Sequence, residues 1–361
     1  MGRTLIHQSL RFVILSLVLA VSTASPALGQ GKKPSYSIKE YQVYKAAVSV
    51  EDPVKREDAI LGYLKTKPNA ELYKYALNNF LALIQAHQKK ADFKRVLSAS
   101  EKLLTVEPNN MSAIGLSLDS AYRLQQHQKV IGYGEKVYAT KPSPETAFAL
   151  AQAFLATNQR EQQKKAQLSP KEKKKAKREK KNKNAKFLIY APKACDKPPP
   201  KDTYSCASLL AQLTSIYLEQ KKWAEASKYG KKALEGFKTV QKGAGTSQAE
   251  WDKYVKRQRA LAHAAMARNA AERRNWGGAI SNYNQALRAD SWVGLRGEAL
   301  YYIGMGRWRQ GQIDAAMKSF GRGSKQRGAP HAKPCRKHLE KLYKSTHNDS
   351  LAGIEEFIAS L

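Results

Sequence analysis

The sequence predicts an all-α fold, a right-handed α-solenoid built from stacked antiparallel helical hairpins. Near the C-terminus, Leu300, Ile303 and Gly304 share one helical face, and Ala316 and Phe320 lie four residues apart on the helix that follows. Small residues at a helix crossing let two backbones approach closely, and the bulky residue one turn later fills the space beside them. The pattern recurs along the chain, and no alternating apolar run of useful length indicates a strand.

The recurrence has a period close to that of a known repeat. Ile131 follows Val96 by 35 residues, and Ala316 follows Ala279 by 37 residues. The unit resembles the tetratricopeptide repeat, which has a period of about 34 residues and a core of Leu-Gly followed by Ala-x3-Phe. The resemblance implies about seven helical hairpins between residues 38 and 328.

These hairpins follow one another in order, and each is defined by its apolar residues. The first four are marked by Tyr41, Tyr44, Ile60, Tyr63 and Leu64; by Phe80, Ile84, Phe93 and Val96; by Leu118, Tyr122, Ile131 and Tyr138; and by Ala147, Leu150, Ala151 and Phe154. The fifth and sixth are marked by Leu210, Leu213, Tyr217, Trp223 and Ala226, and by His263, Met266, Ala267, Ala279 and Tyr283. Residues 329–361 are expected to form capping helices, in which Leu339, Leu342, Ile354 and Phe357 cover the end of the stack.

The first 29 residues have the pattern of a secretory signal peptide. Arg3 and Arg11 form a positive region, residues 12–21 are apolar but too few to span a bilayer, and Ala27-Leu28-Gly29 supplies the small-x-small cleavage pattern. The alternative is an uncleaved membrane anchor, which the polar residues and proline around the apolar run disfavour. We therefore expect a soluble protein of the bacterial cell envelope, periplasmic or otherwise exported, that begins with an exposed segment at residues 30–37.

The chain of 361 residues has a formal net charge of +33, which favours acidic partners without choosing among them. Thirteen Lys or Arg residues and three Glu fall between residues 160 and 186, which we interpret as a Lys-rich insertion in the fourth hairpin. Ser169-Pro170 is a helix start, and Phe187, Leu188 and Ile189 are expected to supply the apolar face of that helix. The residues expected to contact an anionic surface are Lys171, Lys173, Lys174, Lys175, Lys177, Arg178, Lys180 and Lys181; the alternative is a solvated insertion that binds nothing.

Export gives the three cysteines an oxidising context. Cys195 and Cys206 bracket three consecutive prolines within a loop expected over residues 192–205. The ends of that loop must return close together if helices pack on either side, so we predict a disulfide, the alternative being two free buried thiols. Cys335 is left over and is interpreted as a small core residue of the cap.

The sequence does not favour catalysis or cofactor binding. His331, Cys335 and His338 have spacings that suit a metal on one helix face, but Pro334 leaves His331 in the preceding loop and no further ligand completes the set. We therefore predict no metal site, no cofactor and no enzymatic activity, since paired carboxylates and nucleophile motifs are also missing. Nucleic acid is an unlikely partner, because no aromatic residue interleaves the lysines.

The family resemblance implies instead a partner-binding groove on the concave surface that the first helix of each hairpin lines. The corresponding positions are Leu81, Gln85, Leu116, Arg123, Phe148, Gln152, Arg268, Tyr301, Met305 and Trp308. Trp308 is either the principal anchor for a partner or an ordinary packing residue between repeats. The resulting hypothesis is an exported, non-catalytic scaffold that binds a protein or peptide. The alternatives are a basic adaptor for an anionic envelope polymer or membrane surface, and an accessory subunit of an envelope enzyme or secretion complex.

Overall fold

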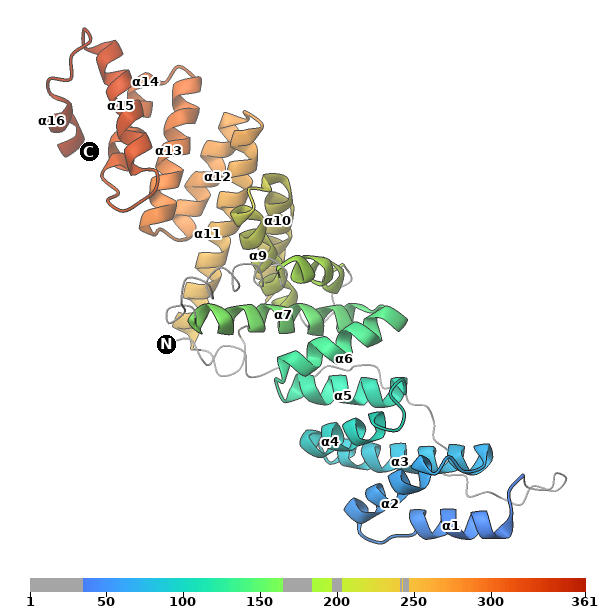
Figure 1. The fold of residues 1–361 in the computed structure, drawn as a ribbon. Helices are drawn as coiled ribbons and strands as arrows, with labels where there is room; N and C mark the ends of the chain where they lie inside the picture. The colour runs from blue at the N-terminus through green and yellow to red at the C-terminus, as the bar shows by residue number, and fades with distance from the viewer. Residues whose placement is uncertain (1–34, 165–183, 197–202, 241, 243–246) are drawn as a thin grey trace. The chain divides into compact units, whose positions relative to one another are not determined.

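The computed structural model describes residues 35–164, 184–196, 203–240, 242 and 247–361, and among these residues it contains helices, turns and loops but no strand (Figure 1). No helix within these ranges combines the length and the apolar composition that crossing a bilayer requires. The chain divides into two compact units, which meet in sequence between Ala194 and Cys195. The sequence had indicated one continuous solenoid; the division falls beside the proline-rich loop.

The N-terminal unit is a series of hairpins in which each helix packs on the next. Its helices are α1 (Ile38–Val48), α2 (Pro53–Lys65), α3 (Ala70–Lys89), α4 (Phe93–Leu104), α5 (Met111–Arg123), α6 (His127–Thr140), α7 (Pro144–Lys164) and a helix over residues 184–194. Side-chain caps begin the first two of these helices. Ser37 and Glu40 form a capping box at α1, and Asp52 caps α2 ahead of a proline at its first position.

The C-terminal unit continues the same plan from α9 to the chain end. Its helices are α9 (Thr203–Glu219), α10 (Trp223–Thr239), α11 (Gln248–Glu272), α12 (Trp276–Ala289), α13 (Val293–Arg309), α14 (Ile313–Ser324), α15 (Ala332–Thr346) and α16 (Ile354–Ala359). The last two helices are the predicted cap. Leu339 and Leu342 of α15 and Ile354 of α16 are buried in one cluster with Phe320 of α14.

Five hairpins make their internal turn in the same way. In each, the second residue after the end of the first helix has a left-handed backbone. The residue that follows it donates its N–H to the carbonyl oxygen five positions earlier, at 2.9 to 3.1 Å. This is the Schellman motif, and it satisfies carbonyl groups that the helix end leaves unpaired. The left-handed residues are Ala91, Gln125, Lys221, Arg274 and Gly311.

The small residues lie where the sequence predicted close helix crossings. Ala279 and Ala316 are fully buried, and Tyr283 and Phe320 fill the core one turn later. At Gly304 an added Cβ would lie 2.7 Å from the ring of Phe320, so α13 and α14 can approach this closely only because residue 304 has no side chain. The hairpin length, the turn and this packing are those of a tetratricopeptide-like α-solenoid.

The fourth hairpin differs from the expectation in one respect. Its second helix continues to residue 194 and buries Phe187, Tyr190 and Ala194, which lie on one face at helical spacing. Ile189, expected on that face, is wrongly assigned: it is 47% exposed, because it lies about 200° around the helix from Phe187. The helix start expected at Ser169 and the lysines expected to contact an anionic surface lie outside the described residues.

Candidate functional site

The first helices of successive hairpins in the C-terminal unit touch one another, from α9 to α11, α11 to α13 and α13 to α15. Side chains from these helices meet on one face, joined there by a side chain from α10. We call this group the arginine–aromatic cluster; it consists of Trp223, Arg268, Glu298, Tyr301, Tyr302, His331 and His338. Arg268 and Tyr301 are residues for which the sequence predicted partner contact. The cluster therefore brings part of the predicted groove together.

Arg268 of α11 is the centre of this cluster. The carbon of its guanidinium group lies 4.2 Å from the ring centroid of Tyr302 and 4.5 Å from that of Trp223, and its side chain is 15% exposed. Cation–π attraction of this kind stabilises a cation that has lost most of its water. The Nε and Nη1 atoms are buried and make no hydrogen bond to any described residue. Arg268 is thus held in place by the two rings, with two buried nitrogen atoms that no described residue satisfies.

Glu298 of α13 is the nearest carboxylate, but it forms only a loose ion pair with Arg268. The distance from Arg268 Nε to Glu298 Oε1 is 3.9 Å. The same Oε1 accepts a hydrogen bond of 2.8 Å from the hydroxyl of Tyr283. Burial raises the pKa of Tyr283 well above its ordinary value, so this hydroxyl stays protonated and keeps donating. Glu298 is therefore oriented by Tyr283 more than by Arg268.

Two histidines from the cap complete the aromatic wall. The ring of His331 lies 5.3 Å from that of Tyr301, and the ring of His338 lies 5.6 Å from Tyr301 and 5.6 Å from Trp308. Burial lowers the pKa of both histidines, which are consequently neutral at pH 7. At neutral pH this wall is an uncharged aromatic surface beside a fixed arginine.

The metal site that His331, Cys335 and His338 could have formed does not assemble in the part of the chain that the structure describes. His331 is the N-cap residue of α15, so it precedes the helix as expected, although the helix begins before Pro334. Cys335 is fully buried, and burial raises the pKa of its thiol to about 12. A protonated thiol in an apolar core is a poor metal ligand.

The remaining residues of the predicted C-terminal contact site pack against the cap. Tyr301, Met305 and Trp308 are partly buried beside the cluster that contains Phe320 and Leu339. Lys341 of α15 lies 5.4 Å from the ring of Trp308. Trp308 therefore serves packing at least in part, which was the alternative reading of this residue.

In the N-terminal unit the predicted groove residues already have partners. Gln152 accepts a hydrogen bond of 2.7 Å from Tyr122, and Arg123 pairs with Asp119 at 3.0 Å while its guanidinium group lies 4.6 Å from the ring of Phe93. Phe148 is buried, and the half-buried Leu81 and Leu116 pack against the core of this unit, while Gln85 is half-buried. These residues contribute to the fold more than to an open surface.

Three residues of the cluster were not predicted as site residues from the sequence: Trp223, Glu298 and Tyr302. Glu298 and Tyr302 share a helix face with Tyr301 and Met305, a signal that the helical spacing carried. Trp223 was identified only as a repeat core residue.

The disulfide expected between Cys195 and Cys206 is present, with 5.5 Å between the two Cα atoms, and Cys335 is free and buried.

No protein-family model matches the chain, and no curated protein matches it. Among solved structures the chain is similar to yeast Tom70, with 14% identity and a TM-score of 0.34 over 89% of this chain, and it spans 61% of that chain. It is also similar to a tetratricopeptide repeat protein from Parabacteroides merdae, with 11% identity and a TM-score of 0.29 over 84% of this chain and 99% of that one.

Proposed function

We propose that the protein is an exported, non-catalytic scaffold and that its C-terminal unit binds a protein partner through the arginine–aromatic cluster. The observation that carries the proposal is the state of Arg268. Its guanidinium group is positioned between two rings, mostly buried, and two of its nitrogen atoms lack hydrogen-bond partners among the described residues. A carboxylate of the partner that reaches the 15% of this side chain left exposed would meet a cation already fixed in position.

The surroundings define the rest of the partner. Tyr301, Tyr302 and Trp308 offer aromatic area at small entropic cost, as residues that dominate binding energies commonly do. Residues 195–361 contain 29 Lys or Arg and 15 Asp or Glu, so the unit attracts acidic chains over a distance. The favoured partner is a protein segment in which an acidic side chain lies next to an apolar or aromatic one. Export rests on the signal-peptide pattern of residues 1–29.

The test compares three forms of the mature protein as bait in envelope extracts, with captured proteins quantified by mass spectrometry and the affinity of the captured protein then measured. Arg268→Met keeps the apolar stem but removes the charge, and Lys256→Met is a matched control at an exposed position of the same helix. We expect Arg268→Met to weaken binding by about 2 kcal/mol or more, because it removes one member of a desolvated charge pair. Unchanged affinity for Arg268→Met, with its melting temperature preserved, would refute the proposal.

Arg268→Lys sharpens the result because it keeps the positive charge and loses the planar fork. If the partner supplies a carboxylate to Arg268, the lysine variant should bind more weakly than the wild type and more strongly than the methionine variant. Equal binding by the lysine variant and the wild type would indicate long-range attraction only, which high salt would abolish.

A further inference from the structure

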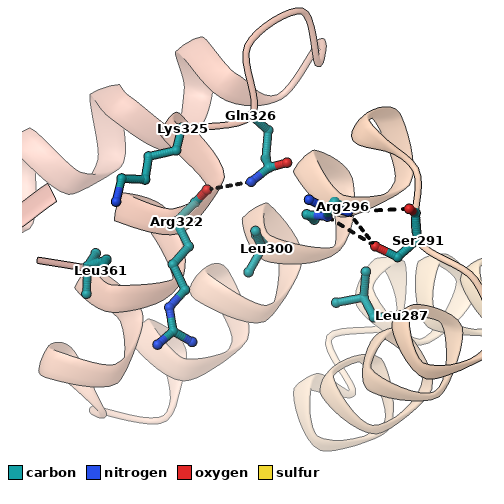
Figure 2. A pocket seen from close by; sticks show the side chains of 8 residues that line it. All are labelled: Leu287, Ser291, Arg296, Leu300, Arg322, Lys325, Gln326 and Leu361. Carbon is teal, nitrogen blue, oxygen red and sulfur yellow. Dashed lines mark hydrogen bonds between the residues drawn. The ribbon is translucent and has the colours of Figure 1, made fainter. Parts of the chain in front are cut away.

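A second site lies on the opposite face of α13 from the arginine–aromatic cluster. A cavity of about 330 Å³ lies where the end of α12, the start of α13, the end of α14 and the last residue of the chain meet. Figure 2 shows the side chains that line it. It is lined by Leu287, Ser291, Arg296, Leu300, Arg322, Lys325, Gln326 and Leu361. Along α13, Arg296 and Leu300 lie about 140° around the helix axis from Tyr301 and Met305, so the two sites use different surfaces.

The cavity combines an apolar part with three cations. Leu287, Leu300 and Leu361 supply the apolar part, and all three are partly buried. Leu361 can lie against α14 because residue 321 is glycine, and a Cβ at that position would clash with the Leu361 side chain. The apolar part is thus shaped by packing within the unit.

No Asp or Glu side chain lines the cavity, and the α-carboxylate of Leu361 forms no ion pair with a described residue. The single negative charge of that carboxylate leaves an excess of positive charge from the three cations. Arg296 donates to the Ser291 hydroxyl at 2.9 and 3.1 Å, and Lys325 donates to the carbonyl of Ala359 at 3.3 Å, so both have neutral partners. The guanidinium group of Arg322 has no hydrogen bond or ion pair with another residue in the described part of the chain. Part of its charge is balanced by the C-terminal end of α14, whose last turn contains Arg322. The remaining field still favours an anion.

We propose that this cavity binds a small amphipathic anion, namely a phosphate or carboxylate group attached to a short aliphatic chain. The head group would lie between Arg296, Arg322 and Lys325, and the aliphatic chain against the three leucines. The volume is at the small end of the range for ligand pockets, about 300 to 1,000 Å³, which fits one head group and a short chain. The site is independent of the proposed partner-binding face, since it shares none of its residues.

The test uses calorimetric titration of the full mature protein at low salt with three probes: octyl phosphate below its critical micelle concentration, inorganic phosphate, and 1-octanol. We expect octyl phosphate to bind about tenfold or more tightly than inorganic phosphate, because each buried methylene contributes roughly a fourfold gain. It should also bind more tightly than 1-octanol, because octanol has no negative charge for the three cations to attract. If inorganic phosphate bound as tightly as octyl phosphate, charge alone would account for binding. If 1-octanol bound as tightly as octyl phosphate, the three cations would contribute nothing to binding. Either result would overturn the proposal.

Variants locate the binding. Arg322→Gln should weaken octyl phosphate binding by about threefold to fivefold, as expected for one exposed cation, and Arg296→Gln combined with it should weaken binding further. Leu361→Ala should weaken octyl phosphate binding and leave the response to inorganic phosphate unchanged. Lys333→Gln, an exposed cation of α15 outside the cavity, is the matched control and should have no effect. Equal losses in the control and in Arg322→Gln would overturn the site.

A final arm separates a soluble ligand from a membrane surface. Vesicles that contain phosphatidic acid present the same head group within a bilayer. If the protein binds such vesicles but not free octyl phosphate, the cations belong to a surface that recognises membranes, and the cavity proposal fails.

Discussion

Glu57 offers the sharpest test of how the N-terminal unit is held together. Its side chain is fully buried on α2, and it contacts Arg95 of α4 and His87 of α3. Arg95 forms a fork, with Nε 3.2 Å from one carboxylate oxygen and Nη2 3.0 Å from the other. Lys102 lies 3.9 Å from the second oxygen. One carboxylate thus joins the first hairpin to the second.

We predict that Glu57→Gln destabilises the first two hairpins by about 2 to 3 kcal/mol. Removing one partner from a buried ion pair costs about 3 to 5 kcal/mol when the other charge stays buried. Here Arg95 and Lys102 are 25% and 36% exposed, so water recovers part of that cost. The loss should remain substantial, because glutamine cannot accept the Arg95 fork as a carboxylate does.

The assay is hydrogen–deuterium exchange of the full protein, read by mass spectrometry. Peptides from α1 to α4 should lose protection by about 30- to 150-fold, which corresponds to the predicted free energy. Peptides from α13 and α14 serve as an internal control and should not change. Replacing Glu57 and Arg95 together with apolar residues should recover part of the protection, since the buried ion pair is removed as a whole and Lys102 still pairs with Asp58 at 2.6 Å. A change of less than twofold in α1 to α4 for Glu57→Gln would refute the reasoning.

Three further predictions follow from single features. Lys221→Gly should stabilise the protein by about 0.5 to 1 kcal/mol in thermal melts, because Lys221 has φ 57° and glycine adopts that backbone without strain; Lys222→Gly, outside the left-handed position, should not stabilise it. Burial lowers the pKa of His331 and His338, so their contribution to stability is complete above the unfolded pKa of 6.5 and is lost as the pH falls below it. The variant that combines His331→Gln and His338→Gln should therefore show a smaller drop in melting temperature between pH 7.5 and 5.5 than the wild type. An equal drop in the two proteins would contradict this prediction. Deleting residues 162–182 should leave the thermal transition nearly intact and reduce binding to anionic liposomes at low salt only, whereas unfolding would show that the segment belongs to the core.

The sequence predicted the helices because apolar spacing in a helical repeat is a local property. Leu300, Ile303 and Gly304 mark a helix face regardless of what the rest of the chain does. The caps at Ser37 and Asp52 are also local motifs, although they were not predicted. A left-handed turn has a clear sequence signal only where glycine occupies it, as at Gly311. At Ala91 and Arg274 the repeat geometry imposes a positive φ on residues that do not favour it, so composition gave no signal.

The site was predicted less completely because it depends on contacts between distant segments. Arg268 contacts Tyr302 from the next hairpin and Trp223 from the preceding one. The residue types and the helical spacing within one helix do not predict contacts between different hairpins. The same limit applies to the cavity, where Leu287 comes from one hairpin and Arg296 and Arg322 come from the two helices of the next. Helical periodicity identifies which face is buried, while inter-helix packing decides which exposed side chains converge.

The difference between the two units also bears on where a partner binds. Both contain an arginine on the first-helix face with its guanidinium group over an aromatic ring, Arg123 above Phe93 and Arg268 above Tyr302. Arg123 is already paired with Asp119 at 3.0 Å, in the same helix, so a partner's carboxylate would have to displace an existing ion pair. Arg268 has its nearest carboxylate at 3.9 Å, and that carboxylate accepts a hydrogen bond from Tyr283 instead. Desolvation of Arg268 is offset by the two rings, and its Nε and Nη1 atoms have no hydrogen-bond partner among the described residues. A partner's carboxylate therefore gains more at Arg268 than at Arg123, which is why we assign recognition to the C-terminal unit.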